Sequence, residues 1–498
     1  QALTANLTDE LSSVGQDDVP TGPRPLWTLT AMAEATKGRL PNGDEDVAVT
    51  GLSIDTRTLQ PGEAYFAIKG DVHDGHKFVA NAHDTGAAVS VVSQEWVDQL
   101  EGDCGRLLVV DDVLDALIRL GLAARARTDA QIVAITGSVG KTTTKEMLRT
   151  GLSACGDVHA AVASFNNHWG VPLTLARMPA DSAYAVIEIG MNHPGEITPL
   201  VQMTRPNVVV INNVAAVHLG AFNSVDEIAH AKSEIFDGLI PGGTAVLNAD
   251  DERLYIMQER AKQASVSNTV LFGEAPHADV RLDKLNMMDT GSTLSATVMG
   301  EPVMLKVGAP GRHIAQNALV VLAVAKLFEA DLAAVSLALA DMEAVKGRGQ
   351  QHELTVGPGT ATLIDESYNA NPKSMAASLD LLGSREPAPG GRRIAVLGDM
   401  LELGEMSAQL HADIAEPITK NRISRVFLAG PDIRALRDRL NNQKGVHVTW
   451  SETSEELAKL LGDELRAGDV VMVKASLGMA FAKIISHLLK RYGDEPDA

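Results

Sequence analysis

In the segment ITGSVGKTTTKEM, residues 135–147, two glycines at positions 137 and 140 precede Lys141 and a run of three threonines. Glycine-rich turns that end in lysine and threonine hold phosphate groups, because their backbone N–H groups can approach an anion closely. Lys141 would reach the terminal phosphates of a nucleotide, and the Thr142 hydroxyl would bind Mg²⁺. The spacing is shorter than in the standard motif, since Ile135 occupies the position of its first glycine. The residues expected to bind nucleotide here are Gly137, Ser138, Val139, Gly140, Lys141, Thr142 and Thr143.

This loop must be positioned by a strand and a helix. The apolar run at residues 131–136 is typical of a buried parallel strand, and residues 142–152 have a helical composition. A helix that begins after the loop directs free N–H groups and the positive end of its dipole toward a phosphate. An ordinary glycine-rich turn is the alternative, and we favour the nucleotide site because strand, glycines, lysine and threonine occur together.

Two further residues follow apolar runs that we expect to be strands of the same sheet. Glu188 ends the run at residues 183–190, and His218 lies just beyond the run at residues 207–212. Side chains at the carboxyl ends of parallel strands face the ligand crevice. Glu188 could bind Mg²⁺ or position a water molecule, and a salt bridge is an equally good alternative. For His218 a structural role is the alternative to a role in the site.

Lys232 lies on the apolar stripe of an expected helix at residues 224–239. Val225, Ile228, Ile235 and Leu239 mark that stripe. Lysine is rarely fully buried, so one interpretation is a buried stem whose ammonium group reaches solvent. The other is a lysine of lowered pKa that reacts with CO₂ to form a carbamate, which turns a cation into a carboxylate that can bind Mg²⁺.

Two residues in the last third of the chain complete the set of candidates. Asp365 lies at the expected end of a strand in IDESYNANPKSM, residues 364–375, and could bind a ribose hydroxyl. A turn-forming aspartate is the alternative. Arg348 lies at the junction of two regions of alternating strands and helices, where it could meet a phosphate when they close together. A solvated charge in a linker is its alternative.

Composition narrows the functional class. The 498-residue chain has a net charge of −21, which argues against nucleic-acid binding. It lacks a run of about 18 apolar residues, so we expect no insertion into a membrane. The only cysteines are Cys104 and Cys155, without the spacing of a metal site, which favours a reducing compartment and a cytoplasmic protein.

Alternating strand and helix patterns predict an α/β protein of three domains. Residues 1–26 are expected to be a flexible lead-in, 27–128 and 129–345 the first two domains, and 346–498 the third.

Several longer segments together resemble the Mur ligase family, over nearly everything after residue 27. They include SIDTRTLQPGEAYFAIKGDVHDGHKFV, GSVGKTTTKEM, SFNNHWGVPLTL, EIGMNHPGEI, AHAKSEIF, KGRGQ and LGDMLELGEMS. The resemblance implies an N-terminal α/β domain that binds a UDP-sugar, a central P-loop ATPase domain with a parallel sheet, and a C-terminal Rossmann-like domain. DGHKF, DESYNANP and GDMLELG resemble the members that join D-alanyl-D-alanine to UDP-N-acetylmuramoyl-tripeptide.

The resemblance also implies site residues, cofactors and a mechanism. ATP would be consumed, the tripeptide carboxylate would become an acyl phosphate, and the amine of the dipeptide would displace phosphate, in a monomer acting in peptidoglycan precursor synthesis. Lys141, Lys232, His218 and Arg348 would be catalytic, with Thr142, Glu188, His218 and carbamylated Lys232 as Mg²⁺ ligands. The implied nucleotide contacts beyond the loop are His313, Asn317, Arg348, Asp365 and Tyr368. The implied substrate contacts are Ser53, Asp55, Thr56, Arg57, Asn166 and Asn167.

Three alternatives remain at this stage. One is a ligase that adds a different amino acid, similar to the diaminopimelate- or lysine-adding Mur enzyme (MurE) or to folylpolyglutamate synthetase. Another is a P-loop regulatory ATPase, which would hydrolyse ATP without a carboxylate or amine substrate and would leave Lys232 unexplained. The third is a UDP-sugar-binding relative without catalysis, which the presence of Lys141, Glu188 and Lys232 disfavours.

Overall fold

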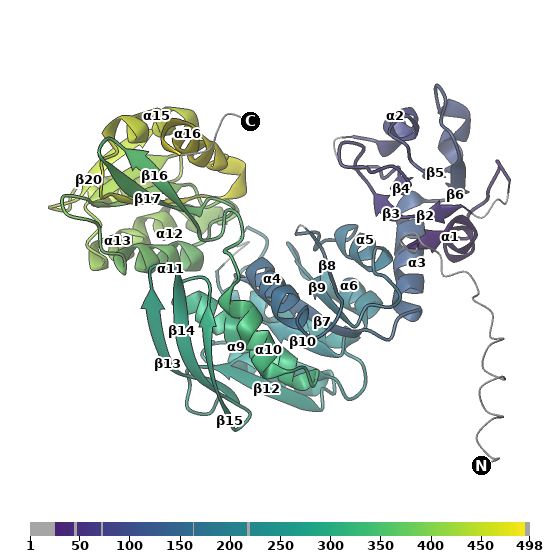
Figure 1. Ribbon diagram of the computed structural model, residues 1–498, viewed down its shortest axis with the longest axis horizontal. Coiled ribbons are helices and arrows are strands. Elements are labelled where there is room, and N and C mark those ends of the chain that lie inside the picture. The colour runs from purple at the N-terminus through teal and green to yellow at the C-terminus, as the bar shows by residue number, and fades with distance from the viewer. Residues whose placement is uncertain (1–24, 44–46, 71–72, 163, 217–219, 494–498) are drawn as a thin grey trace, which may run out of the picture. The chain divides into compact units, whose positions relative to one another are not determined.

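The computed structural model describes residues 25–43, 47–70, 73–162, 164–216 and 220–493 (Figure 1). His218 and nearly all of the expected lead-in, residues 1–26, therefore lie outside the described residues. Contacts divide the chain into a unit that ends at Ala124 and a second unit that begins at Arg125. None of the described helices combines the length and the apolar character needed to cross a membrane.

The first unit contains a parallel sheet with the strand order β3-β4-β5-β6. Its strands are β3 (Gly51–Ser53), β4 (Glu63–Phe66), β5 (Val89–Ser93) and β6 (Leu107–Val110), and an antiparallel pair is formed by β1 (Trp27–Thr28) and β2 (Ala48–Val49). The helices are α1 (Leu29–Thr36), α2 (Val79–Asp84) and α3 (Val113–Ala126), whose last two residues fall in the second unit, with 3₁₀ helices η1 (Gly75–Phe78) and η2 (Gln94–Gln99). Because β3 ends at Ser53, residues 55–57 follow at the carboxyl edge of this sheet.

The second unit begins with a nine-stranded sheet in the order β15-β14-β13-β12-β11-β10-β7-β9-β8. Its strands are β7 (Gln131–Thr136), β8 (Val158–Ala160), β9 (Tyr184–Glu188), β10 (Val208–Ile211), β11 (Thr244–Asn248), β12 (Asn268–Gly273), β13 (Val280–Met288), β14 (Gly291–Val298) and β15 (Glu301–Val307). Neighbouring strands from β13 to β8 pair in parallel, whereas β14 pairs antiparallel with β13 and β15. The strand expected before the glycine-rich loop is β7, in the parallel part of this sheet.

Helices cover both faces of the parallel part of the nine-stranded sheet, because Val133 and Ile135 of β7 enter one core and the alternating Ile132 and Ala134 are buried outside it. They are α4 (Lys141–Leu152), α5 (Gly170–Ala176), α6 (Ile197–Thr204), α7 (Val225–Lys232), α8 (Leu254–Gln263), α9 (Arg312–Leu327) and α10 (Leu332–Ala340), with the 3₁₀ helix η3 (Ser233–Gly238). In the middle of the chain α4, α9 and α10 pack on one another and share one core with β7, β10 and β11. Helix α9 is buried on nearly every side, and its apolar residues belong to this core. This packing fixes the start of α9 beside the glycine-rich loop.

The last part of the chain forms a six-stranded sheet in the order β16-β17-β21-β18-β19-β20. Its strands are β16 (Gln350–Val356), β17 (Gly359–Glu366), β18 (Arg393–Gly398), β19 (Arg425–Ala429), β20 (His447–Ser451) and β21 (Val470–Lys474), and β16 alone pairs antiparallel within this sheet. Ala395 and Leu397 of β18 enter one core, and Ile394 and Val396 enter a second core. This sheet is therefore covered on both faces, as in a doubly wound α/β domain.

Helices α11 to α14 cover the first of those two faces, and α15 and α16 cover the second. Their bounds are α11 (Pro372–Gly383), α12 (Ser407–Asp413), α13 (Ala415–Lys420), α14 (Arg434–Leu440), α15 (Ser454–Glu464) and α16 (Ala482–Tyr492), and the 3₁₀ helices are η4 (Gly404–Met406) and η5 (Leu477–Met479). The expected α/β architecture with parallel sheets is confirmed.

One expected helix is shorter than the sequence pattern predicts. Residues 224–239 do not form one α-helix, because α7 ends at Lys232 and η3 follows. The Ser233 hydroxyl donates a hydrogen bond to the Ala229 carbonyl at 2.7 Å, a backbone contact that competes with regular helix geometry. Lys232 therefore lies at the last residue of a helix rather than within one.

Candidate active site

The glycine-rich loop joins the end of β7 to the first residue of α4. Gly140 has φ +84°, in the left-handed region that favours glycine. At Gly137, with φ +154°, an added Cβ would lie 2.9 Å from Cβ of Asn212. Both glycines are therefore required by the local geometry, and helix α4 begins at Lys141 with its N–H groups toward the loop.

Residues that follow β10 hold this loop in place. The Asn213 side chain accepts a hydrogen bond from Val139 N at 2.9 Å and donates one to Val139 O at 3.0 Å. Ser138 Oγ donates to Ala215 O at 3.1 Å and accepts from Ala215 N at 2.9 Å. These four bonds fix the loop conformation before any phosphate is bound.

The Asn213→Ala substitution removes two of these bonds. We expect it to raise KM for ATP about thirtyfold, since each of the two hydrogen bonds contributes about 1 kcal/mol, and to change kcat much less. Steady-state kinetics at varied ATP would measure both constants. Asn268→Ala is a matched control, because the Asn268 side chain donates to the exposed Gly242 carbonyl at 3.1 Å, away from the loop. An unchanged KM in Asn213→Ala would show that the loop does not depend on this contact.

Lys141 lies along the loop that it follows. Its Nζ donates a hydrogen bond to the Gly137 carbonyl at 2.7 Å. Burial lowers the pKa of Lys141, Glu188 acts in the opposite direction, and Arg348 lowers it further. An anion placed beside these two cations would raise the pKa of Lys141 again, so the geometry suits a phosphate group.

Glu188 is the carboxylate nearest to the loop threonine. It is only 2% exposed. It accepts hydrogen bonds from Thr142 Oγ1 at 2.9 Å and from Asn166 Nδ2 at 2.8 Å. No described lysine or arginine forms an ion pair with Glu188, so the salt-bridge interpretation finds no support there. A hydroxyl and a carboxylate oxygen in contact are ligands of the kind that Mg²⁺ prefers.

The Glu188→Gln substitution keeps the size of the side chain and removes its charge. We expect the Mg²⁺ concentration for half-maximal activity to rise about tenfold, because a ligand charge is lost while the contact with Thr142 can persist. Titrating Mg²⁺ at saturating ATP would measure this concentration, with Glu259→Gln on the exposed face of α8 as the control. The same half-maximal concentration in Glu188→Gln and the native protein would exclude a role in metal binding.

Lys232 is buried at the end of α7, with 2% of its surface exposed. The structure therefore contradicts the interpretation in which the Lys232 ammonium group reaches solvent. Burial lowers the pKa of Lys232 well below its usual value, and Lys141 lowers it further. No carboxylate in the described ranges forms an ion pair with it. A lowered pKa favours the neutral amine, which is the form that reacts with CO₂.

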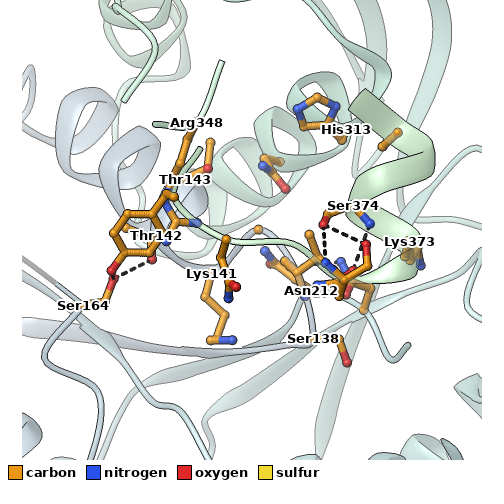
Figure 2. A pocket seen from close by; sticks show the side chains of 18 of the residues that line it. Ser138, Lys141, Thr142, Thr143, Ser164, Asn212, His313, Arg348, Lys373 and Ser374 are labelled. Carbon is orange, nitrogen blue, oxygen red and sulfur yellow. Dashed lines mark hydrogen bonds between the residues drawn. The ribbon is translucent and has the colours of Figure 1, made fainter. Parts of the chain in front are cut away.

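A cavity of about 390 Å³ collects most of the predicted site residues (Figure 2). The predicted residues that line it are Ser138, Val139, Gly140, Lys141, Thr142, Thr143, Asn166, Glu188, His313, Asn317, Arg348 and Tyr368. Among the described predicted residues of the second unit, those that do not line it are Gly137, Asn167, Lys232 and Asp365. Gly137 nevertheless belongs to the loop, and the Asn167 side chain accepts a hydrogen bond from Gly170 N at 2.9 Å beside the start of α5.

The start of α9 forms the part of the cavity wall beside the loop. The pKa of His313 is lowered by burial, raised by Glu366, and lowered by Lys474. Asn317, one helical turn later, lies beside Gly140, where an added Cβ would be 3.2 Å from its side-chain oxygen. Between them Ile314 is buried in the core and takes no part in the cavity wall.

Residues from the last part of the chain close the cavity. The Arg348 guanidinium lies over the Tyr368 ring, 4.1 Å from the ring centroid. Asp365 is buried and accepts a hydrogen bond from Ser367 N at 3.0 Å. Its neighbour Glu366 lines the cavity instead and pairs with Lys474 Nζ at 3.3 Å.

Several lining residues were not predicted from the sequence. They include Ser164, Asn212, Asn213, Glu366, Lys373, Ser374 and Lys474. Lys474 ends β21, so the rule that strand ends face a ligand could have identified it. Ser164 and Lys373 follow no such pattern.

The candidate substrate residues of the first unit form a compact turn after β3. The Ser53 hydroxyl donates to Asp55 O at 3.0 Å. Arg57 donates two hydrogen bonds from Nε and Nη2 to the Asp55 carboxylate, at 2.9 and 2.6 Å, while its side chain remains 86% exposed. Thr56 lies between them, partly exposed. The turn therefore presents a positioned guanidinium to solvent.

Three family descriptions match separate parts of the chain. They are the Mur ligase catalytic domain over residues 48–125, the Mur ligase middle domain over residues 135–325 and the Mur ligase glutamate ligase domain over residues 347–477. These matches include the turn after β3, the glycine-rich loop and the residues that close the cavity.

Relatives of similar length match almost end to end. The chain is 35% identical to the UDP-N-acetylmuramoyl-tripeptide--D-alanyl-D-alanine ligase of Escherichia coli (strain K12) and 31% identical to that of Rickettsia prowazekii (strain Madrid E). Each alignment covers 93% of this chain, with 98% and 99% of the respective relative.

Solved structures agree with this relationship. A crystal structure of MurF from Acinetobacter baumannii superposes with a TM-score of 0.79 and 28% identity, over 94% of this chain and all of that chain. MurF from Thermotoga maritima in complex with ADP superposes with a TM-score of 0.73 and 25% identity, over 88% of this chain and 97% of that one. The chain belongs to the Mur ligase family, in its MurF branch.

Proposed function

We propose that this chain joins D-alanyl-D-alanine to the peptide carboxylate of UDP-N-acetylmuramoyl-tripeptide, with ATP as the energy source. The observation that carries the proposal is one cavity in which Lys141, Thr142 and Glu188 face Arg348 from the last part of the chain. A lysine, a hydroxyl, a carboxylate and an arginine around one cavity are suited to phosphoryl transfer. The relatives that match this chain almost end to end are named as this ligase.

Transfer of the γ-phosphoryl group to the tripeptide carboxylate needs stabilisation of negative charge. Lys141 and Arg348 supply two cations, and the N–H groups at the start of α4 supply dipoles toward the same anion. The product is an acyl phosphate, and attack by the dipeptide amine on its carbonyl carbon forms the amide and expels phosphate. The phosphate therefore leaves with one oxygen of the original carboxylate.

Mg²⁺ fits the residues at the loop. Thr142 and Glu188 would hold it, and when bound it supplies charge neutralisation for the phosphate oxygens. The described residues contain no group of three histidine, cysteine or acidic side chains that could hold a metal ion by themselves. A carbamate on Lys232 and the His218 side chain would add the remaining ligands.

Water must be excluded from the acyl phosphate, which otherwise hydrolyses. Arg348, Tyr368 and Lys474 lie on the cavity wall contributed by the last part of the chain. We assign residues 346–498 to the domain that completes the ATP site, residues 129–345 to the ATPase domain and residues 27–128 to the UDP-sugar domain. Because all cavity residues belong to one chain, a monomer would suffice, acting in the cytoplasm where ATP is available.

Nucleotide and sugar contacts complete the proposal. His313, Asn317 and Asp365 would contact the adenosine part of ATP, and Tyr368 would contact the nucleotide beside Arg348. The turn of Ser53, Asp55, Thr56 and Arg57 would bind the uridine diphosphate, because its exposed guanidinium suits a diphosphate. Asn166 and Asn167 would meet the sugar-peptide near the reacting carboxylate.

The test is phosphate release in a complete mixture of MgATP, UDP-N-acetylmuramoyl-tripeptide and D-alanyl-D-alanine, compared with mixtures that omit each one. We expect release only in the complete mixture, with a product whose mass has increased by one dipeptide residue. Replacing the dipeptide by single amino acids distinguishes other Mur-type ligases. Equal release without the tripeptide and the dipeptide would favour a regulatory ATPase and contradict the proposal.

A further inference from the structure

Three hydroxyl groups form a continuous chain along one wall of the cavity. Figure 2 labels two of the residues that carry them, Thr142 and Ser164. The Tyr368 hydroxyl lies 3.2 Å from Ser164 Oγ. Ser164 Oγ lies 3.1 Å from Thr142 Oγ1, which lies 2.9 Å from Glu188 Oε2. Tyr368 and Ser164 are 204 positions apart in sequence, so the chain of contacts joins the two sheets of the second unit.

The direction of these hydrogen bonds follows from counting protons. The Glu188 carboxylate can only accept, so Thr142 donates its single proton to it. Thr142 has no second proton, so Ser164 must donate to Thr142. Ser164 has then used its own proton and accepts from the Tyr368 hydroxyl. All three hydroxyl groups therefore point the same way, an arrangement in which each bond strengthens the next.

This arrangement fixes how the Thr142 oxygen presents itself to a ligand. A hydroxyl oxygen has two lone pairs. One lone pair of Thr142 accepts from Ser164, and the proton is directed to Glu188, so one lone pair remains for a metal ion. Asn166, two residues after Ser164, donates to the other Glu188 oxygen at 2.8 Å. The segment at residues 164–166 thus orients both side chains of the expected metal site.

Tyr368 makes a second contact with different chemistry. Its ring lies under the Arg348 guanidinium at 4.1 Å, within the range of a cation–π interaction. One side chain therefore orients Arg348 through its ring and Ser164 through its hydroxyl.

We propose that Ser164 and the Tyr368 hydroxyl are positioning residues that orient the Thr142 oxygen toward Mg²⁺ at the same time as Arg348 is held for the γ-phosphate. This inference rests on the proposed function for the identity of the reaction. The Thr142 oxygen and the Arg348 guanidinium are then brought into position together. The phosphoryl group therefore contacts both of them or neither of them.

The test is a double-mutant cycle on binding of a non-hydrolysable ATP analogue, measured by calorimetry in Mg²⁺ and again in EDTA. The variants are Ser164→Ala, Tyr368→Phe and the double variant. Tyr368→Phe keeps the ring under Arg348 and removes only the hydroxyl. Tyr255→Phe, on an exposed tyrosine of α8, and Ser486→Ala, on an exposed serine of α16, are the matched controls.

We expect each single variant to weaken binding in Mg²⁺ about fivefold, the effect of one hydrogen bond, and to leave binding in EDTA within about twofold of the native value. The double variant should match either single variant, because both remove the same chain of bonds. The inference would be overturned if the losses of affinity of the two single variants multiplied in the double variant. It would also be overturned if those losses were equal with and without Mg²⁺, or if no variant lost affinity. This binding assay needs no ligase turnover. If the native protein failed the phosphate-release test, the proposed function would be contradicted, whereas the binding data would still support or overturn this inference.

Discussion

Lys232→Ala is expected to lower the rate of amide formation about a thousandfold, equivalent to about 4 kcal/mol of transition-state stabilisation. The physical reason is the state of this side chain. It is buried, lacks an ion pair with any described carboxylate, and has a pKa lowered well below its usual value by burial and by Lys141. As a carbamate it would place a carboxylate at a position where no described acidic residue pairs with this side chain, and alanine cannot form one.

Short carboxylic acids give this prediction its specific test. Acetate or formate added to Lys232→Ala should restore part of the activity, because the substitution leaves space for a small carboxylate. Removing CO₂ and bicarbonate should slow the native protein and leave the variant unchanged. Lys262→Ala, whose lysine is 77% exposed on α8, is the control for loss of a lysine. Full activity of Lys232→Ala, or the same rescue by a neutral amide, would contradict the carbamate.

Arg348→Ala is expected to lower kcat about a thousandfold and to change KM for ATP much less, because arginines that neutralise a transferring phosphoryl group contribute 10³–10⁵-fold. Arg348→Lys should restore little of this loss, since an ammonium group lacks the planar contact with the Tyr368 ring. Single-turnover measurement of phosphate release would isolate the transfer step.

Arg491 provides a matched control for this substitution. It also lies over a tyrosine ring, 5.3 Å from the centroid of Tyr492, but on the exposed surface of α16. Arg491→Ala should keep the native kcat. An Arg348→Ala variant that releases phosphate at the native rate would show that this arginine does not act in the transfer.

The sequence predicted those parts of the site that depend on local pattern. The strand at residues 131–136, the glycine turn and helix α4 all follow from residues within about 20 positions of one another. Glu188 was identified because a strand end in a parallel sheet faces the ligand crevice. Its hydrogen bond to Thr142 agrees with that interpretation, although the metal itself remains a prediction.

Contacts between distant residues could not be predicted in the same way. Asn213 contacts Val139 across 74 positions, and Tyr368 contacts Ser164 across 204. Neither pair has a sequence spacing that a helix or a strand would impose. Such pairs are defined only when the sheets and loops are assembled.

Asp365 and Glu366 are adjacent at the end of β17, and of the two Glu366 lines the cavity. Successive side chains of a strand point to opposite faces, so Asp365 and Glu366 cannot both face the cavity in the same way. The structure places Glu366 in the cavity wall and buries Asp365 against the turn that follows. Periodicity alone does not determine which of two adjacent acids faces a ligand, because that choice depends on the register of the neighbouring strands.

The most direct test of the ligase mechanism follows one oxygen atom. UDP-N-acetylmuramoyl-tripeptide labelled with ¹⁸O in both oxygens of the reacting carboxylate would be incubated with MgATP and D-alanyl-D-alanine, and the released phosphate analysed by mass spectrometry. Transfer through an acyl phosphate predicts one ¹⁸O atom in each phosphate released and one retained in the new amide. Phosphate that carries only solvent oxygen, with both labels left on the tripeptide, would show that the protein hydrolyses ATP without activating this carboxylate.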